Sequence, residues 1–165
     1  MIEDNVIPIR LLLVDDEEDL VVFLAHRLRK RGIEVDVAQS GAEALALTDK
    51  RFDVAVVDLK MPDMDGITVI ERFKEKQPFL EALMLTGHGS HDSAWEAGRL
   101  QAFRYLLKPY DFDELLEIIQ NAARQRRERM REEFDEKLQA LLTEHTSPRD
   151  LMDASEKLRR EYEQN

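Results

Sequence analysis

The sequence has 165 residues, with 35 acidic and 24 basic side chains and a formal net charge of −11. A chain of this length builds one domain of ordinary size and leaves about forty residues over. The negative charge argues against a protein that grips nucleic acid phosphates or anionic lipid, because long-range repulsion opposes both encounters. The absence of cysteine excludes disulfides, cysteine-ligated zinc and a thiol nucleophile.

The sequence shows neither a membrane helix nor a secretion signal. The longest uninterrupted apolar run, residues 20–25, is far shorter than the roughly 20 residues that span a bilayer. The N-terminus lacks the basic region, apolar stretch and cleavage site of a signal peptide. We therefore expect a cytoplasmic protein that contacts neither membrane nor nucleic acid directly.

Strand and helix patterns alternate along the first 120 residues. Short apolar runs that end in polar residues indicate buried strands, and apolar positions at helical spacing follow each of them. Strands are expected at residues 10–14, 34–38, 54–57, 83–85 and 105–107, and helices at about 17–31, 40–49, 67–76, 90–100 and from 111 onward. Capping boxes, Ser40 with Glu43 and Asp111 with Glu114, mark two of the helix starts.

Five strands separated by helices of this length predict the fold class. They imply a parallel sheet with right-handed crossovers and helices on both faces. We therefore expect an α/β fold with a doubly wound, flavodoxin-like sheet of five strands. In the common strand order 2-1-3-4-5, strands one and three are neighbours where the order reverses, and open α/β sheets bind their ligands there.

The chain changes character near Arg124. Residues 124–165 hold 10 basic and 11 acidic side chains, so nearly all of the net charge belongs to residues 1–123. An apolar stripe from Ala123 to Leu141 continues the fifth helix, which would be about 50 Å long if it ran unbroken from 112 to 144. Pro148 begins a further helix. We expect a globular domain at 1–123 and a helical extension at 124–165.

The extension has two opposed interpretations. It is too short for the usual winged-helix output domain, and its balanced charge lacks the basic footprint of DNA binding. One interpretation is a solvated extension that adds only solubility. The apolar stripe favours the other, in which helices pair, either folding back as a hairpin or joining two chains. We favour an extension that, with the fifth helix, forms a homodimer or docks a partner.

Polar side chains follow four of the five expected strands. Asp15 and Asp16 come after the first strand, Asp58 after the third, Thr86 after the fourth and Lys108 after the fifth. The carboxyl ends of parallel strands meet at one edge of the sheet. We therefore expect these five side chains to line one pocket.

Three carboxylates in one pocket imply a bound cation. Each would have its pKa raised by the others unless a positive charge stabilised the ionised forms. All-oxygen ligation suits Mg²⁺, which takes one or two carboxylates together with phosphate oxygens. The predicted substrate is then a phosphoryl group, with Asp58 as its nucleophile, Lys108 neutralising the phosphoryl oxygens and Thr86 donating a hydrogen bond.

Four sequence blocks occur in order and at characteristic spacing. They are Val14-Asp15-Asp16, the run 57–66 that reads Val-Asp-Leu-Lys-Met-Pro-Asp-Met-Asp-Gly, Leu85-Thr86-Gly87-His88-Gly89, and Tyr105-Leu106-Leu107-Lys108-Pro109. With these blocks, residues 9 to about 123 resemble the receiver domain of bacterial two-component response regulators. The resemblance covers about three quarters of the chain, and four blocks together are far more specific than any one of them.

The resemblance implies a reaction and a ligand set. It implies transfer of a phosphoryl group from a sensor histidine kinase to Asp58. Mg²⁺ would be held by Asp16, Asp58 and the backbone carbonyl of Lys60, with Asp15 contributing through water. The peptide bond between Lys108 and the following proline is usually cis in this family.

The resemblance also implies a switch. Thr86 would move toward the phosphoryl oxygens and Tyr105 would rotate inward, which shifts the population between two packings. A downstream protein would read the change on the surface made by the fourth helix, the fifth strand and the fifth helix. Lys60 and His88 would tune the loss of the phosphoryl group from the protein.

Other interpretations of the same residues remain. The acids from Glu17 to Asp19 are explained by their favourable position at a helix N-terminus. The leading hypothesis is a response regulator that signals by protein contact and is not an enzyme acting on an external substrate. The rivals are a receiver-like interaction module that is never phosphorylated and a regulatory subunit whose output domain lies on another chain. The identity of the kinase, the target and the stimulus is not encoded in any motif.

Overall fold

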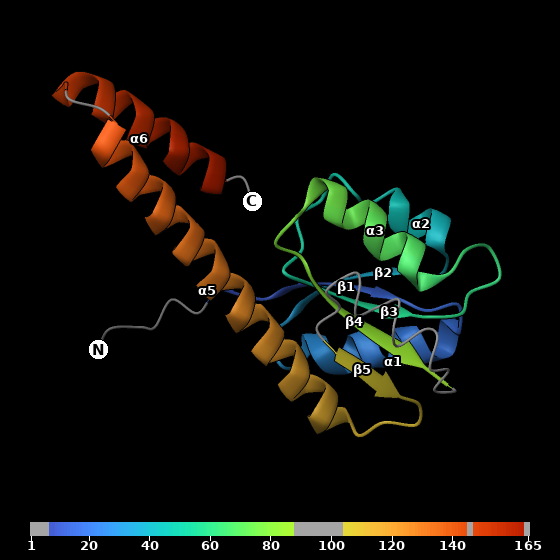
Figure 1. Ribbon diagram of the computed structural model, residues 1–165. Coiled ribbons are helices and arrows are strands. Elements are labelled where there is room, and N and C mark those ends of the chain that lie inside the picture. Colours follow the sequence, from blue (N-terminus) through green and yellow to red (C-terminus); the bar gives the residue numbers. More distant parts are fainter. Residues whose placement is uncertain (1–6, 88–103, 145–146, 164–165) are drawn as a thin grey trace. The chain divides into compact units, whose positions relative to one another are not determined.

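The computed structural model describes residues 7–87, 104–144 and 147–163 (Figure 1). The chain divides into two compact units, Met1–Ala123 and Arg124–Asn165. Among the described residues, no helix combines the length and apolar character needed to cross a membrane.

The first unit is built on a parallel sheet of five strands. The strands are β1 (Arg10–Val14), β2 (Glu34–Ala38), β3 (Val54–Asp58), β4 (Glu81–Thr86) and β5 (Arg104–Leu107). Their order is β2-β1-β3-β4-β5 and every pair is parallel. This arrangement confirms the predicted doubly wound α/β fold, and β4 starts two residues earlier than expected.

Helices cover both faces of the sheet (Figure 1). They are α1 (Glu18–Arg29), α2 (Gly41–Leu45), α3 (Gly66–Lys76) and the start of α5 (Phe112–Glu144). Alternate residues of each buried strand face opposite sides of the sheet. On β1, Leu11 packs in one core cluster with α1 and α5, whereas Leu12 packs in the other with α2 and α3. The helix expected at 90–100 lies outside the described residues.

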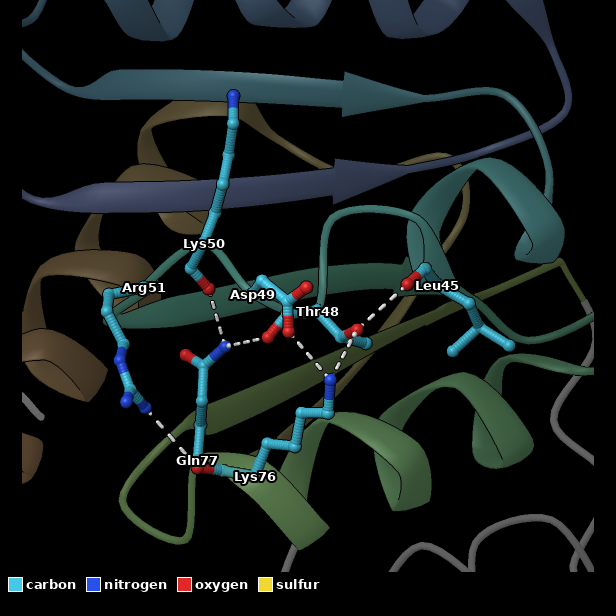
Figure 2. Close-up of polar contacts among 7 residues, drawn as sticks. All are labelled: Leu45, Thr48, Asp49, Lys50, Arg51, Lys76 and Gln77. Carbon is cyan, nitrogen blue, oxygen red and sulfur yellow. Dashed lines mark hydrogen bonds and ion pairs between the residues drawn. The ribbon is translucent and has the colours of Figure 1, made fainter.

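Helix α2 ends earlier than its sequence pattern predicts. It was expected to reach about Asp49 but ends at Leu45. Figure 2 shows why: the buried Gln77 side chain donates hydrogen bonds from Nε2 to the carbonyls of Thr48 at 3.3 Å and Lys50 at 2.6 Å. Thr48 Oγ1 also donates to the Leu45 carbonyl at 2.9 Å. Because Gln77 satisfies the carbonyls of Thr48 and Lys50 from a distant segment, these residues need no helical hydrogen bonds and the chain can turn toward β3.

The second unit contains the predicted helical extension. Helix α5 continues to Glu144, and α6 (Pro148–Glu163) begins at the expected proline. Within residues 124–165, α6 packs against the last part of α5, with the rings of Phe134 and Tyr162 edge to face at 5.4 Å and Leu158 buried. The extension therefore folds back on its own chain as a hairpin.

Candidate functional site

Three carboxylates meet at the carboxyl end of the sheet. Asp15 and Asp16 follow β1, and Asp58 is the last residue of β3. Strands β1 and β3 are paired, with Val14 opposite Val57, so the residues after them are neighbours. One oxygen of each carboxylate lies within 4.8 Å of the others. Asp15 and Asp58 are buried, whereas Asp16 is exposed, so the cluster has one side open to solvent.

Lys108 brings a positive charge into this cluster. It follows β5, and its backbone N–H donates to the Thr86 carbonyl at 2.8 Å. Its Nζ lies 2.7 Å from Asp15 Oδ2 and 3.5 Å from Asp58 Oδ1. The peptide bond between Lys108 and Pro109 is cis, as the resemblance implied. The side chain thus spans the sheet from β5 to the ends of β1 and β3.

The electrostatics of the site follow from burial and from the three acids. The pKa of Asp58 is raised to about 6, chiefly by burial and in part by the charges of Asp15 and Asp16, while the ammonium of Lys108 opposes the rise. Burial by itself would lower the pKa of Lys108, but its hydrogen bond to Asp15 and the surrounding carboxylates raise it above its ordinary value. One lysine therefore does not neutralise the cluster, and a further cation would stabilise the ionised form of Asp58.

A cavity of about 200 Å³ opens over Asp58. It is lined by Glu17, Asp58, Lys60, Thr86, Gly87 and Lys108. Thr86 is buried, and Lys60 is exposed at the mouth. The cavity thus places a carboxylate, a hydroxyl and an ammonium around a space that a phosphoryl group can enter.

The structure also places Tyr105. It is half-buried on β5 and packs against the core cluster that contains Leu12 and Phe73. His88, the second residue expected to tune phosphoryl loss, lies outside the described residues.

Glu17 belongs to the site, which the sequence interpretation missed. The sequence interpretation attributed this acid to the favourable position of a negative charge at the start of α1. In the structure, however, the Glu17 side chain caps no backbone N–H of this helix. Instead, Glu17 Oε1 lies 3.4 Å from Lys108 Nζ and lines the cavity. Its position immediately after the two acids at the end of β1 was the available signal.

A groove of about 470 Å³ adjoins the cavity. It runs between α1 and residues 108–112, and Leu20, Phe23 and Phe112 supply much of its lining. Glu17 and Lys108 line both the groove and the cavity. A molecule in the groove would therefore lie next to the carboxylate cluster.

The fold and this site define a phosphoacceptor domain, and comparison with known families agrees. Residues 11–120 match the response regulator receiver domain, and the chain belongs to this family. The role of the family is to receive a phosphoryl group from a sensor kinase in two-component signalling, through an acidic pocket that binds Mg²⁺. Receiver domains interact with sensor histidine kinases and with output partners.

Curated relatives are transcriptional regulators. The chain is 39% identical to the transcriptional regulatory protein GlrR of Escherichia coli over 119 aligned residues. The aligned segment covers 72% of this chain and 27% of GlrR. It is 36% identical over 111 residues to the DNA-binding transcriptional regulator NtrC of Klebsiella pneumoniae, covering 67% of this chain and 24% of the relative. The chain thus spans about a quarter of the length of these relatives.

Solved structures share the fold of the first unit. A CheY-like receiver domain from Methanospirillum hungatei has a TM-score of 0.71 at 28% identity, covering 74% of this chain and 99% of that one. The response regulator TrrA from Thermotoga maritima, crystallised with Mg²⁺ and BeF, has a TM-score of 0.62 at 30% identity. That comparison covers 68% of this chain and 97% of TrrA.

Proposed function

We propose that this chain is a phosphorylation-activated response regulator that accepts a phosphoryl group on Asp58 from a sensor histidine kinase. The observation that carries the proposal is the meeting of three carboxylates within 4.8 Å beside the Nζ of Lys108. Family membership supplies the reaction class. A cytoplasmic location, where the kinase would reach it, is part of this proposal.

The donor set fits Mg²⁺. Carboxylate and carbonyl oxygens are the ligands that Mg²⁺ prefers, and the pKa of Asp58 stays raised by burial and by Asp15 and Asp16 although Lys108 opposes the rise. We assign Asp15, Asp16, Asp58 and the carbonyl of Lys60 to the ion, with Asp15 acting through water. When bound, Mg²⁺ would neutralise negative charge on the phosphoryl oxygens.

The protein's own residues have distinct tasks in the proposed transfer. An oxygen of Asp58 attacks phosphorus, the P–N bond to the donor imidazole breaks with its electron pair left on nitrogen, and a P–O bond forms. Lys108 balances the charge of the phosphoryl oxygens, and the hydroxyl of Thr86 donates a hydrogen bond to one of them. No separate base is needed because the carboxylate is already ionised at neutral pH.

The output is proposed to be a change of surface. Thr86 is drawn toward the phosphoryl group, and Tyr105, which is half-buried, rotates into the space that is freed. A downstream protein reads the surface of residues 90–100, β5 and α5. Lys60 at the cavity mouth and His88 set the lifetime of the phosphoryl group, which the decay of the phosphorylated protein measures. The chain then modifies only itself and is not an enzyme for an external substrate.

The kinase is proposed to approach over the groove beside α1. A donor histidine must reach Asp58 through the open side of the cavity, and the groove shares the lining residues Glu17 and Lys108 with this cavity. Phe23, 60% exposed, offers an apolar contact there. The groove is thus available to a helix of the donor protein.

Phosphorylation is tested with a small donor. We expect acetyl phosphate with Mg²⁺ to produce a retarded band in phosphate-affinity electrophoresis, and EDTA to abolish it. Asp58→Asn should give no such band, whereas Asp19→Asn, which changes an exposed acid of α1, should behave like the wild type. An unmodified wild type, under conditions that label another receiver domain, would support the unphosphorylated interaction module instead.

The hairpin is proposed to join two copies of the chain. Its outward apolar side chains include Leu142, 48% exposed, and Met152, 64% exposed. We expect light scattering of the full chain with Mg²⁺ and fluoroberyllate to give the mass of two chains. The variant that combines Leu142→Glu with Met152→Glu should give the mass of one chain under the same conditions. Val22→Glu, at an exposed apolar position of α1, is the control. A wild type of one-chain mass in every condition would remove the dimer.

A further inference from the structure

The loop between β3 and α3 carries the carbonyl that we assign to the metal. Its first end is tied to β4, because the Leu59 N–H donates to the Leu85 carbonyl at 2.8 Å, and its two ends are tied to each other, because the Gly66 N–H donates to the Leu59 carbonyl at 2.9 Å. Between these ends lie residues 60–65. A backbone carbonyl has no rotamer of its own, so the course of this loop alone decides where the Lys60 carbonyl points.

Asp63 ties the tip of this loop to another part of the fold. Its Oδ1 accepts a hydrogen bond from the Gly41 N–H at 3.1 Å, and its Oδ2 accepts one from the Ala42 N–H at 2.9 Å. Gly41 and Ala42 open α2 and precede Asp63 by more than twenty residues. The hydrogen bonds from Ala42 and Gly41 hold the pKa of Asp63 below its usual range. The carboxylate is therefore ionised, and both of its oxygens are engaged.

Helix α2 does not depend on Asp63 alone for capping. Ser40 is its N-cap, and Ser40 Oγ accepts from the Glu43 N–H at 3.1 Å. The amides of Gly41 and Ala42 are further N–H groups that the helix cannot satisfy internally. These two N–H groups donate to Asp63 and so attach the β3–α3 loop to the start of α2.

Met64 and Gly41 fit against each other at the same contact. A Cβ on Gly41 would overlap Met64 Cγ and would lie 2.5 Å from Met64 Sδ. The backbone of Gly41 does not adopt a positive φ, so the close approach of Met64 is what requires glycine there. The loop is thus held by two hydrogen bonds and by a close contact in which a Cβ on Gly41 would force the Met64 side chain to move.

We propose that Asp63 is a positioning residue of the phosphoacceptor site: by binding the start of α2, it holds the β3–α3 loop so that the Lys60 carbonyl faces the metal position. The inference rests on the proposed Mg²⁺ site. Asp63 does not belong to the carboxylate cluster of Asp15, Asp16 and Asp58, so it acts through the loop and not as a ligand.

The test compares two caps of the same helix in the full chain. Mg²⁺ affinity is measured by isothermal titration calorimetry without a phosphodonor, and thermal unfolding is measured in EDTA. Asp63→Ala and Ser40→Ala should both lower the melting temperature, because each removes a cap from α2. Only Asp63→Ala should weaken Mg²⁺ binding. We expect the affinity to fall about tenfold, as it does when a residue that orients a metal ligand is removed. The Mg²⁺ affinity of Asp63→Asn should lie between those of the wild type and Asp63→Ala, since the amide keeps one acceptor oxygen.

A second pair of variants tests the loop by shape. Gly41→Ala should weaken Mg²⁺ binding because the new methyl group displaces Met64. Adding Met64→Ala to Gly41→Ala should restore the affinity, since the smaller side chain leaves room for the methyl group.

The outcomes separate the positioning role from the metal site. If the wild type binds Mg²⁺ and Asp63→Ala and Asp63→Asn bind it equally well, the positioning role is wrong and the metal site stands. If Ser40→Ala weakens binding as much as Asp63→Ala, Asp63 is only a helix cap and the inference fails. If the wild type binds no Mg²⁺, or Asp58→Asn binds it as the wild type does, the metal site fails and the positioning role fails with it.

Discussion

Replacing Lys108 with alanine is expected to lower the stability of the Mg²⁺-free protein by about 3 kcal/mol and the rate of phosphorylation about 100-fold. The stability loss arises because Asp15, whose side chain is 2% exposed, loses the ammonium that lies 2.7 Å away. A loss of this size corresponds to a melting temperature lower by about 6–12 °C in a chain of this length. Mg²⁺ should restore more stability to the variant than it adds to the wild type, because the ion replaces the missing positive charge.

The matched control for this variant is Lys50→Ala. Lys50 pairs with Asp36 at 2.9 Å, but the two side chains are 60% and 38% exposed. An exposed pair contributes at most about 1 kcal/mol, so the melting temperature should hardly change. Differential scanning fluorimetry in EDTA and in Mg²⁺ measures both variants. Equal effects at the two lysines would contradict the view that Lys108 compensates a buried acid.

Replacing Asp58 with asparagine is expected to abolish phosphorylation and yet stabilise the Mg²⁺-free protein. The pKa of Asp58 is raised to about 6 in the folded protein, from 3.8 for an ordinary aspartate, chiefly by burial. The folded state therefore binds the proton more tightly than the unfolded state, and ionisation of Asp58 destabilises the fold. After allowance for solvent screening at the open side, removing the charge should add about 1–2 kcal/mol at neutral pH.

The sign of this effect can be measured as a function of pH. The ionisation of Asp58 should cost the wild type stability as the pH rises from about 4 to about 6, the window between the unfolded and folded pKa of this group. Asp58→Asn should lack this component, so the difference between the two denaturation midpoints should grow across the window. Saturating Mg²⁺ should stabilise the wild type more than the variant. A variant that is less stable than the wild type in EDTA at neutral pH would contradict the prediction.

Much of the candidate site could be predicted because its residues are placed by local signals. Asp15 and Asp58 come directly after apolar runs, and a strand end is readable from the residues on either side of it. In a parallel sheet, all such ends lie at one edge, so the strand order is enough to bring them together. Lys108 follows the same logic, and its Nζ does reach both acids.

Glu17 could not be predicted by the same means. An acid at the first turn of a helix already has a sufficient local explanation, which is the favourable interaction with the helix dipole. Its contact with Lys108 joins residues 91 positions apart. Only the pairing of β5 with β4, and the reach of the lysine across the sheet, show that this acid faces the cavity.

The sequence by itself determined the order of strands and helices, the class of the fold and the residue types that stand at the strand ends, because periodicity, helix caps and strand ends are local properties. Only the tertiary structure decided where α2 stops, that Glu17 joins Asp15 and Asp58 around Lys108, and which helix receives Asp63. Those features depend on side chains such as Gln77, whose partners lie 25 or more residues away. Hydrogen bonds between distant segments require positions in space that no local pattern specifies.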